Sequence, residues 1–337
     1  MYPSQESHYA GIYVKNQYDY LKSNYKDHVF TIKAMQKVKT GFLGSIMKYI
    51  SFLGSSISYL LRKYEIVHVH YFSFHFAFAV LYKIFHPGTK IVLTFHGSDV
   101  NMFSENMVLR RFANLLFRIT RTITICVGMK LADNFHKKFF MKADHIIAAG
   151  LDDDVFVYNK NAEKKYDLTF VGTFSKLKGF DLIYEAITKY KLDYKWCFIG
   201  AGLYYEDLKK LQNEFNISIF SGFTHKDIAE KLNESRFFII PSRSEGFPLA
   251  SIEALYCGVP VICSDLDQFK EQVREGENGF IIDQSTSESI RDTIRKAFAV
   301  SGQDYEKLSS NAASSNKEFT LKNVCSELVK IYKNGKA

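Results

Sequence analysis

The sequence lacks the features that mark several large classes of protein. Its five cysteines are an odd number, they are scattered, and no two have the spacing of a metal-ligand or redox pair. A disulfide framework is therefore not expected, and a reducing compartment fits this chemistry best. The chain has no low-complexity tract and no internal repeat beyond an alternation of apolar runs with helical segments.

Long apolar runs are also missing. Residues 1–5 are polar and do not form the apolar core of a secretory signal. The longest nearly apolar stretch, residues 49–61, holds four serines and is well short of a bilayer span. We therefore expect no transmembrane helix and predict a cytoplasmic protein, with the inner face of the cytoplasmic membrane as one location.

What the sequence does contain is a regular alternation of strand-like and helix-like segments over 337 residues, a length that suits two domains. Near-continuous Val, Ile and Phe runs are typical of parallel strands buried on both faces. Eleven such runs occur, at residues 28–32, 66–70, 90–95, 122–127, 145–148, 167–171, 195–199, 217–220, 237–240, 259–263 and 279–282. Two successive series of this kind predict an α/β protein with two doubly wound, Rossmann-like domains.

The predicted boundary is a stretch rich in Gly, Asp, Asn and Lys near residues 150–165. The first domain covers residues 1–150 and the second covers 165–318. The charge is uneven between the two halves. Residues 1–150 carry 19 basic and 8 acidic side chains, a net +11, whereas residues 151–337 carry 25 and 28, a net −3. The basic half suits an anionic membrane or lipid-linked acceptor, but it also suits an ordinary solvated surface.

One helical stripe in the first half has the same two interpretations. Its apolar members recur at spacings of three and four, with lysines and arginines around them, and are Leu43, Ile46, Ile50, Leu53, Ile57 and Leu60. The helix either packs on the sheet or lies on anionic lipid, and only an exposed stripe would support lipid docking.

The most informative block is residues 241–265. A predicted strand ends in a loop with Glu245 and Gly246, and a helix follows from Phe247 or Pro248 to residue 257. The amides at such a helix start attract anions, and glycine lets backbone approach a ligand closely. Glu253 lies about one and a half turns into the helix, where its carboxylate is able to accept hydrogen bonds from ribose hydroxyls.

At this point the chain resembles the retaining glycosyltransferases of family 4, which have the GT-B fold. The resemblance covers nearly the whole chain, through motifs in this order: YAGIYVKNQ, EIVHVHY, TFHGSDV, AAGLDDDVF, TFVGTFSKLKGFDLIYEAI, CFIGAGLYYEDL, ISIFSGFTHKDI and SEGFPLASIEA. It implies two domains that face each other across a cleft, and a C-terminal helix within residues 321–337 that returns to the first domain. It also implies a nucleotide-sugar as co-substrate, with no cofactor and no metal.

The resemblance gives residue roles on the donor side. It implies that Glu245 contacts the donor sugar, that Glu253 holds the ribose and that Lys178 neutralises the donor diphosphate, with Lys176 as a second charge. The family has an arginine after the strand glycine Gly172, whereas this chain has Thr173. The remaining donor-side candidates are Gly246, Phe247, Pro248, Gly200, Phe223 and Thr224.

In the first domain, His96 follows a buried strand, and a histidine at that end of an α/β strand is expected to face the ligand. The resemblance implies that His96 reaches the donor sugar and phosphates, that Gly11 lies beside the leaving phosphates, and that His70 lines the acceptor side. Asp99 either orients His96 or caps a helix, and His68 is interpreted as a core histidine. No cysteine or carboxylate cluster accompanies the histidines, so they do not suggest a metal site.

Two further departures from the family are visible. The family has a strand directly before the Gly11 motif, which leads us to expect an apolar run upstream of residue 1, and Val127 replaces a common serine. From this resemblance we predict a retaining hexosyltransferase that moves a sugar, from a UDP-sugar donor, to a glycan or lipid-linked acceptor in capsule, lipopolysaccharide or other cell-surface polysaccharide biosynthesis. The alternatives are a non-catalytic nucleotide-sugar-binding scaffold and a sugar-nucleotide 2-epimerase. Nucleic-acid binding is not expected, because no reader motif is present.

Overall fold

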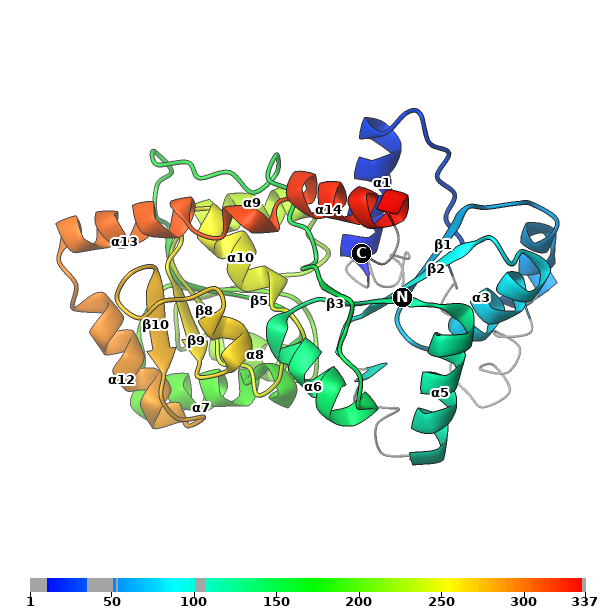
Figure 1. The fold of residues 1–337 in the computed structure, drawn as a ribbon. Coiled ribbons are helices and arrows are strands. Elements are labelled where there is room, and N and C mark those ends of the chain that lie inside the picture. Colours follow the sequence, from blue (N-terminus) through cyan, green and yellow to red (C-terminus); the bar gives the residue numbers. More distant parts are fainter. Residues whose placement is uncertain (1–10, 35–50, 53, 98, 101–106, 335–337) are drawn as a thin grey trace. The chain divides into compact units, whose positions relative to one another are not determined.

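The computed structural model describes residues 11–34, 51–52, 54–97, 99–100 and 107–334. The chain divides into two compact units, which are described separately below. The first unit comprises residues 1–150 together with 319–337, and the second comprises Leu151–Glu318. Both units contain a parallel sheet with helices against it, as Figure 1 shows.

The sheet of the first unit has four parallel strands in the order β1-β2-β3-β4. Its strands are β1 (Ile66–His70), β2 (Lys90–Phe95), β3 (Ile123–Cys126) and β4 (His145–Ile146). Its helices are α1 (Ile12–Asn24), α3 (Phe74–Phe85), α5 (Met107–Thr120), α6 (Met129–Phe139) and α14 (Leu321–Asn334). Residues 54–60 are also helical.

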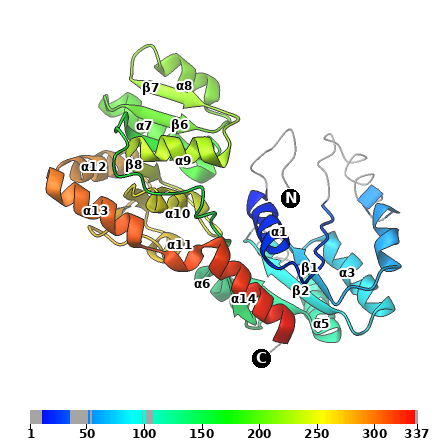
Figure 2. The same ribbon diagram turned by 90° about the horizontal axis from the view of Figure 1, so that it is seen from above.

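The last helix belongs to the first sheet. Val324, Leu328 and Ile331 of α14 join Val92 and Ile123 of the strands in one buried apolar cluster. Other apolar residues of α14 pack against α1, and the two helices lie side by side in Figures 1 and 2. The final helix of the chain therefore completes the core of the unit that holds the first residues.

The strand predicted at residues 28–32 is not present, so that prediction is wrong. The segment has no helix or strand structure, and the side chain of Val29 is 91% exposed. A strand needs a neighbour for its backbone groups, and no strand within the described part of the chain pairs with this segment. Its apolar residues resemble a buried strand in the sequence, but the segment has no paired strand in the described sheet.

In the described sheet, β1 is an edge strand. Lys90 N–H donates to the carbonyl of Glu65, and Tyr71 N–H donates to that of Thr94, so the odd-numbered residues of β1 face β2. The even-numbered backbone groups, those of Ile66 and His68 among them, point away from β2 because successive residues of a strand alternate.

The free edge of β1 borders a cavity of about 280 Å³. All five residues of the strand line it, together with the inner side of α1 and residues 31–34. Gln17 and Tyr64 also line this cavity, and Gln17 Oε1 and Tyr64 Oη are buried with no hydrogen-bond partner among the described residues. This edge of the sheet thus contains polar groups that the surrounding side chains leave unsatisfied.

The sheet of the second unit has six parallel strands in the order β10-β9-β8-β5-β6-β7. Its strands are β5 (Tyr166–Val171), β6 (Trp196–Ile199), β7 (Ile217–Phe220), β8 (Ser235–Ile240), β9 (Val261–Ser264) and β10 (Gly279–Ile282). Its helices are η1 (Lys176–Lys178), α7 (Phe180–Tyr190), α8 (Tyr205–Leu211), α9 (His225–Asn233), α10 (Leu249–Tyr256), α11 (Asp267–Lys270), α12 (Ser287–Phe298) and α13 (Gly302–Ser314). A short turn of helix, η2 (Lys317–Phe319), lies at the boundary with the first unit.

This sheet is covered on both faces, with α7 and α12 on one side and α9, α10 and α13 on the other (Figure 1). Its core is aromatic: Phe174 stacks on Phe180 at a ring-centroid distance of 4.5 Å, and Trp196 stacks on Phe198 at 5.6 Å. All four of these side chains are fully buried. The two-faced burial explains why the strands are continuous apolar runs.

Three further findings concern the sequence predictions. All five cysteines are buried and free of disulfides. In the part of the chain that the structure describes, none of the helices combines the length and the apolar character needed to cross a bilayer. Of the proposed lipid-binding stripe, Leu43, Ile46, Ile50 and Leu53 lie outside the described residues, while Ile57 is exposed.

Candidate functional site

The order of the strands in the second unit marks the candidate donor site. From β5 the chain adds β6 and β7 on one side and then returns to place β8 on the other side. The segments that leave β5 and β8 therefore lead to helices on opposite faces of the sheet, α7 and α10, although the two strands are neighbours. In open α/β sheets, ligands bind in the crevice at such a switch point. Lys178 follows β5 and Glu245 follows β8, so the topology brings these two predicted residues together.

Lys178 and Glu245 form an ion pair. The Lys178 Nζ atom lies 2.7 Å from each carboxylate oxygen of Glu245. The Glu245 side chain is only 7% exposed, whereas that of Lys178 is 29% exposed. Ser242 Oγ also donates to Glu245 Oε1 at 2.6 Å. The carboxylate of Glu245 is thus held by three hydrogen bonds, and Lys178 keeps a face toward solvent from which it is able to meet an anion.

A glycine that the sequence analysis did not single out permits this contact. Gly179 has a φ of +67°, and a Cβ atom at this position would lie 1.9 Å from the carbonyl oxygen of Pro241. Only a residue without a side chain lets the loop after β5 approach the loop after β8 this closely. The position of Gly179 directly after Lys178, before the start of α7, was a signal in the sequence.

Arg243 is a second residue that the sequence analysis missed. Its guanidinium donates to both carboxylate oxygens of Asp181, at 2.6 and 2.8 Å, and its Nη1 atom also donates to the carbonyl of Lys176. Its backbone N–H donates to the carbonyl of Leu177 at 2.9 Å. These bonds fasten η1 to the loop after β8, and hence fix the backbone that carries Lys178. The side chains of Lys176 and Thr173 are exposed.

Glu253 has a different environment from Glu245. It lies inside α10, is 8% exposed, and receives no hydrogen bond to its side chain from any of the residues described. Burial raises the pKa of this carboxyl to about 7. A buried carboxylate without a donor is unfavourable, because desolvation is not compensated. Hydroxyl donors from a ligand would satisfy it.

The helix that carries Glu253 begins at Leu249, later than predicted. Pro248 is the N-cap residue, with extended backbone, so its ring precedes the first turn instead of lying within it. Gly246 and Phe247 therefore belong to the loop and not to the helix. No side chain caps the N-terminus of α10, and its first-turn amides are available to an anion.

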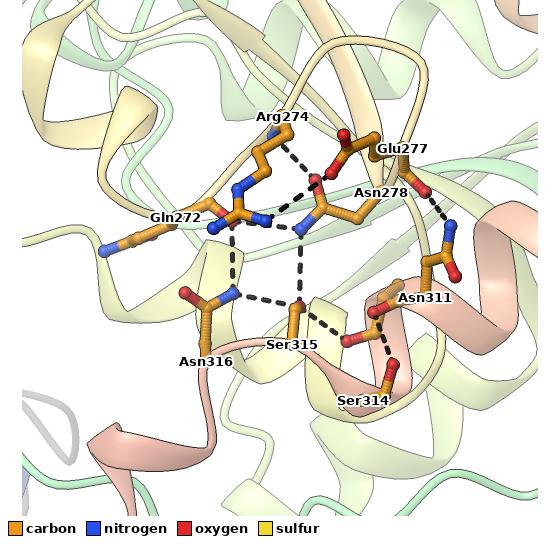
Figure 3. A network of polar contacts seen from close by, with 9 residues as sticks. Gln272, Arg274, Glu277, Asn278, Asn311, Ser314, Ser315 and Asn316 are labelled. Carbon is orange, nitrogen blue, oxygen red and sulfur yellow. Dashed lines mark hydrogen bonds and ion pairs between the residues drawn. The ribbon is translucent and has the colours of Figure 1, made fainter.

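A polar network, whose part around Gln272, Asn278, Ser315 and Asn316 is drawn in Figure 3, is linked to α10 through Ser251. Ser251 Oγ, in the helix, donates to Gln272 Oε1. The carbonyl of Gln272 accepts from the side-chain amides of Asn278 and Asn316, at 3.0 and 3.1 Å, and both amides also donate to Ser315 Oγ. The network joins α10 to the segment before β10 and to the end of α13. It therefore restrains the helix that bears Glu253.

The predicted loop glycines pack backbone against backbone. A Cβ atom on Gly200 would lie 1.9 Å from the carbonyl oxygen of Gly172, and both residues have a φ near +150°. The loops after β5 and β6 are consequently as close as two main chains allow. Phe223 packs on Phe220 of β7 at 4.9 Å. The Thr224 side chain forms a capping box with Asp227 at the start of α9, so its hydroxyl has a structural role.

The first unit holds a separate aromatic cluster at the carboxyl ends of β1 and β2. His70 Nδ1 lies 3.2 Å from His96 Nε2, and the ring of His96 packs against Tyr13 at 4.9 Å and Tyr71 at 4.4 Å. The two tyrosine hydroxyls are hydrogen-bonded to each other. Gly11, with a φ of +69°, is the N-cap of the helix that carries Tyr13. Three of the predicted residues are thus near one another within this unit.

Burial sets the charge of this cluster. It lowers the pKa of His70 to about 4 and that of His96 well below its usual range, so both imidazoles are neutral near pH 7. The cluster therefore offers neutral donors and acceptors to a ligand. The backbone of Tyr71 has a φ of +68°, which is unusual for a residue with a side chain and fixes its ring over His96.

Asp99 orders the loops around these histidines. Its buried carboxylate accepts from the backbone N–H groups of Phe72, His96, Gly97 and Val100, at 2.9 to 3.3 Å. Asp99 thus contacts the main chain of His96 and not its imidazole ring. His68 is a satisfied core histidine, as predicted, because its ring nitrogens are bonded to Tyr332 Oη and Thr94 Oγ1, each at 2.7 Å.

Comparison with known proteins identifies the family and the fold. Residues 152–315 match the model of glycosyl transferases group 1, and residues 23–155 match that of glycosyltransferase family 4. The chain belongs to the group 1 glycosyltransferases of family 4. Its fold is GT-B, with two units built on parallel sheets.

Several known proteins resemble this glycosyltransferase-family chain. An uncharacterized glycosyltransferase of Methanocaldococcus jannaschii is 26% identical over 68% of this chain and 63% of its own length. A GDP-mannose:cellobiosyl-diphosphopolyprenol alpha-mannosyltransferase of Xanthomonas campestris is 24% identical over 75% of this chain and 70% of its own. The crystal structure of Anabaena HepE in complex with UDP-glucose has a TM-score of 0.69 at 16% identity, over 93% and 89% of the two chains.

Proposed function

We propose that this group 1 glycosyltransferase transfers a sugar from a nucleotide-sugar donor to a saccharide or lipid-linked acceptor. The observation that carries the proposal is that two glutamates close to the N-terminus of α10 have opposite environments. Glu245 is compensated by Lys178, whereas Glu253 is buried and receives no hydrogen bond from the described part of the chain. The two hydroxyls of a ribose are donors that would satisfy Glu253.

The proposed leaving group is the nucleoside diphosphate. Negative charge develops on its phosphate as the glycosidic bond breaks, and a fixed cation and a helix N-terminus stabilise that charge. Lys178 and the first amides of α10 are the groups assigned to this task. The ion pair with Glu245 gives Lys178 a defined position before the donor binds. Exposed Lys176 is proposed as a supplementary charge.

The donor is proposed to be a UDP-sugar. The resemblance to family 4 supports this choice, and so does the HepE structure, which contains UDP-glucose. The Xanthomonas relative is named for GDP-mannose, so the guanine nucleotide is the competing choice. That relative is also named for a diphosphopolyprenol acceptor, which supports a lipid-linked acceptor and a role in cell-surface polysaccharide biosynthesis.

Retention at the anomeric carbon is part of the proposal and rests on the family resemblance. The acceptor hydroxyl would attack from the face that the diphosphate leaves, and its proton would pass to the departing phosphate. The two-carboxylate arrangement of glycosidases is a poor analogy, because Glu245 is already neutralised by Lys178. Catalysis would then depend on positioning and on electrostatic stabilisation.

The experiment is donor hydrolysis without acceptor. The purified protein is incubated in turn with UDP-glucose, UDP-galactose, UDP-N-acetylglucosamine and GDP-mannose, and the released nucleoside diphosphate is measured. Lys178→Ala is expected to lower the release by about a hundredfold or more, in line with the loss of one oxyanion donor. Lys307→Ala, at an exposed lysine in α13, is the matched control.

Two results would contradict the proposal. Binding of a nucleotide-sugar without release, even when acceptor sugars are supplied, would favour the non-catalytic scaffold. Release that is equal in the Lys178 variant and in the control would remove Lys178 from the diphosphate site. Retention is tested separately by the anomeric configuration of the first product, and an inverted product would refute that part alone.

A further inference from the structure

The outer face of α5 is apolar where a helix on a soluble surface is normally polar. Phe112, Leu115 and Ile119 recur at spacings of three and four, and their side chains are 57%, 52% and 67% exposed. This spacing places them on one side of the helix. The opposite side packs inward through Ala113 and Phe117. The helix thus has two apolar sides, of which one is in solvent.

The same helix is basic and contains no acid. Arg111 and Arg118 are exposed and lie seven residues apart, beside the apolar stripe. Residues 107–132 hold five basic side chains and no aspartate or glutamate. This local excess belongs to the half of the chain that carries a net +11. An apolar stripe with arginines along one border is complementary to a surface of anionic headgroups above acyl chains.

Neighbouring helices of the same unit also expose apolar side chains. α3 exposes Leu81, Ile84 and Phe85, and α3 and α5 lie next to each other, joined by the edge-on contact of Phe76 with Phe117. Beyond α6, Phe140 is 71% exposed and lies under the guanidinium of Arg110 at 4.7 Å. Each of these segments thus exposes large apolar side chains, which mark interaction surfaces where they are concentrated.

We propose that the face of α5 formed by Phe112, Leu115 and Ile119, with Arg111 and Arg118, is a docking surface for an anionic lipid bilayer. The apolar side chains would enter the boundary between headgroups and acyl chains, and the arginines would contact lipid phosphates. The inference extends the proposed function, since a lipid-linked acceptor is met at a membrane surface. It assigns docking to α5 instead of to the stripe at residues 43–60.

The test is co-sedimentation of the full chain with vesicles, without nucleotide. Vesicles of equal parts phosphatidylglycerol and phosphatidylcholine are compared with vesicles of phosphatidylcholine alone. The protein is expected to bind the anionic vesicles and to be released by salt. Phe112→Glu should weaken binding by about tenfold or more, because it removes buried apolar area and adds a like charge. Arg111→Gln and Arg118→Gln should each weaken binding by about fivefold.

The matched control is Val29→Glu, which introduces the same charge at an apolar side chain that is 91% exposed in the same unit. It should bind like the wild type. The proposal is overturned if the wild type does not bind anionic vesicles, or if Phe112→Glu binds them as well as the control does. It is also overturned if light scattering shows a dimer that only Phe112→Glu dissociates, because the face would then cover a second copy. Retained nucleotide-sugar binding by Phe112→Glu separates failure of this inference from failure of the proposed donor site.

Discussion

Replacement of Glu253 by glutamine is expected to make the folded protein more stable and its donor site weaker. In the unfolded chain this carboxyl has its ordinary pKa of 4.5, whereas burial raises the pKa to about 7 in the folded state. The folded state therefore binds more protons between these two values, and stability falls as the pH rises through that window. Above about pH 7 the loss from this single group amounts to about 3 kcal/mol.

Glutamine has the same shape and no charge, so it removes this loss. The buried amide has an unsatisfied polar group of its own, which reduces the gain to about 1–3 kcal/mol near pH 8. The gain should shrink toward zero below about pH 4.5, where both states of the wild type are protonated. A glutamate that served only to stabilise the fold would give the opposite sign.

Trp196 makes the measurement specific to the second unit. It is the single tryptophan of the chain and is fully buried in that unit, so its fluorescence reports the unfolding of the sheet beside α10. Urea unfolding of wild type and Glu253→Gln at about pH 8 and about pH 4.5 gives the pH dependence of the difference. The control Glu306→Gln, at an exposed glutamate in α13, should leave the free energy of unfolding unchanged at both pH values.

The second half of this prediction concerns the ligand. Calorimetric titration with UDP-glucose and GDP-mannose should show at least a tenfold loss of affinity in Glu253→Gln, because charge-assisted bonds to ribose become neutral ones. A nucleotide-sugar is a better titrant than free UDP, because its diphosphate does not change its protonation state over the pH range of the measurement. Lower stability at high pH would refute the reasoning about burial, and unchanged affinity would refute the role of Glu253 in the donor site.

Three other predictions follow from single contacts. Gly179→Ala should lower the free energy of unfolding by about 2 kcal/mol or more, because its Cβ would meet a carbonyl oxygen. The control Gly222→Ala, with a φ of +72° and open space around it, should lose only about 1 kcal/mol. Equal losses of the two variants in urea unfolding would contradict the close approach at Gly179. Asp99→Ala should destabilise the first unit by about 2–4 kcal/mol, since four backbone N–H groups lose their acceptor. A loss of stability under about 1 kcal/mol would contradict the role of Asp99 in ordering these loops. In hydrogen exchange, the amide of His68 should exchange faster than that of Val67, which faces β2, and equal protection would mean that the free edge of β1 is covered.

The sequence was sufficient to predict most of the strands because burial on both faces leaves a continuous apolar run, as in β5 and β8. It failed at residues 28–32, where Val29 belongs to such a run but is exposed. A strand is stabilised by its neighbours as well as by its own side chains, and the neighbours are not encoded locally.

The candidate site shows a similar division. The motif predicted that Lys178, Glu245 and Glu253 act on one ligand, and the order of β5 and β8 explains how residues 67 positions apart meet. The closest supporting contacts were not predicted. Gly179 permits a close approach of two backbones, whereas Arg243 acts through hydrogen bonds of its guanidinium, and the partners of both residues are distant in the sequence.

The difference between the two glutamates is the property that the sequence could not supply. In the motif they are equivalent acids separated by seven residues, but Ser242 and Lys178 stabilise the charge of Glu245. Glu253 has only burial, which opposes its charge. If ribose hydroxyls provide the missing donors, they compensate the desolvation of the Glu253 carboxylate, which is uncompensated in the free folded protein. The ionised form of Glu253 is then the form that binds the donor. Donor affinity should then fall by about tenfold per pH unit below about pH 7. In Glu253→Gln this dependence should disappear, and its persistence would assign the titration to another group.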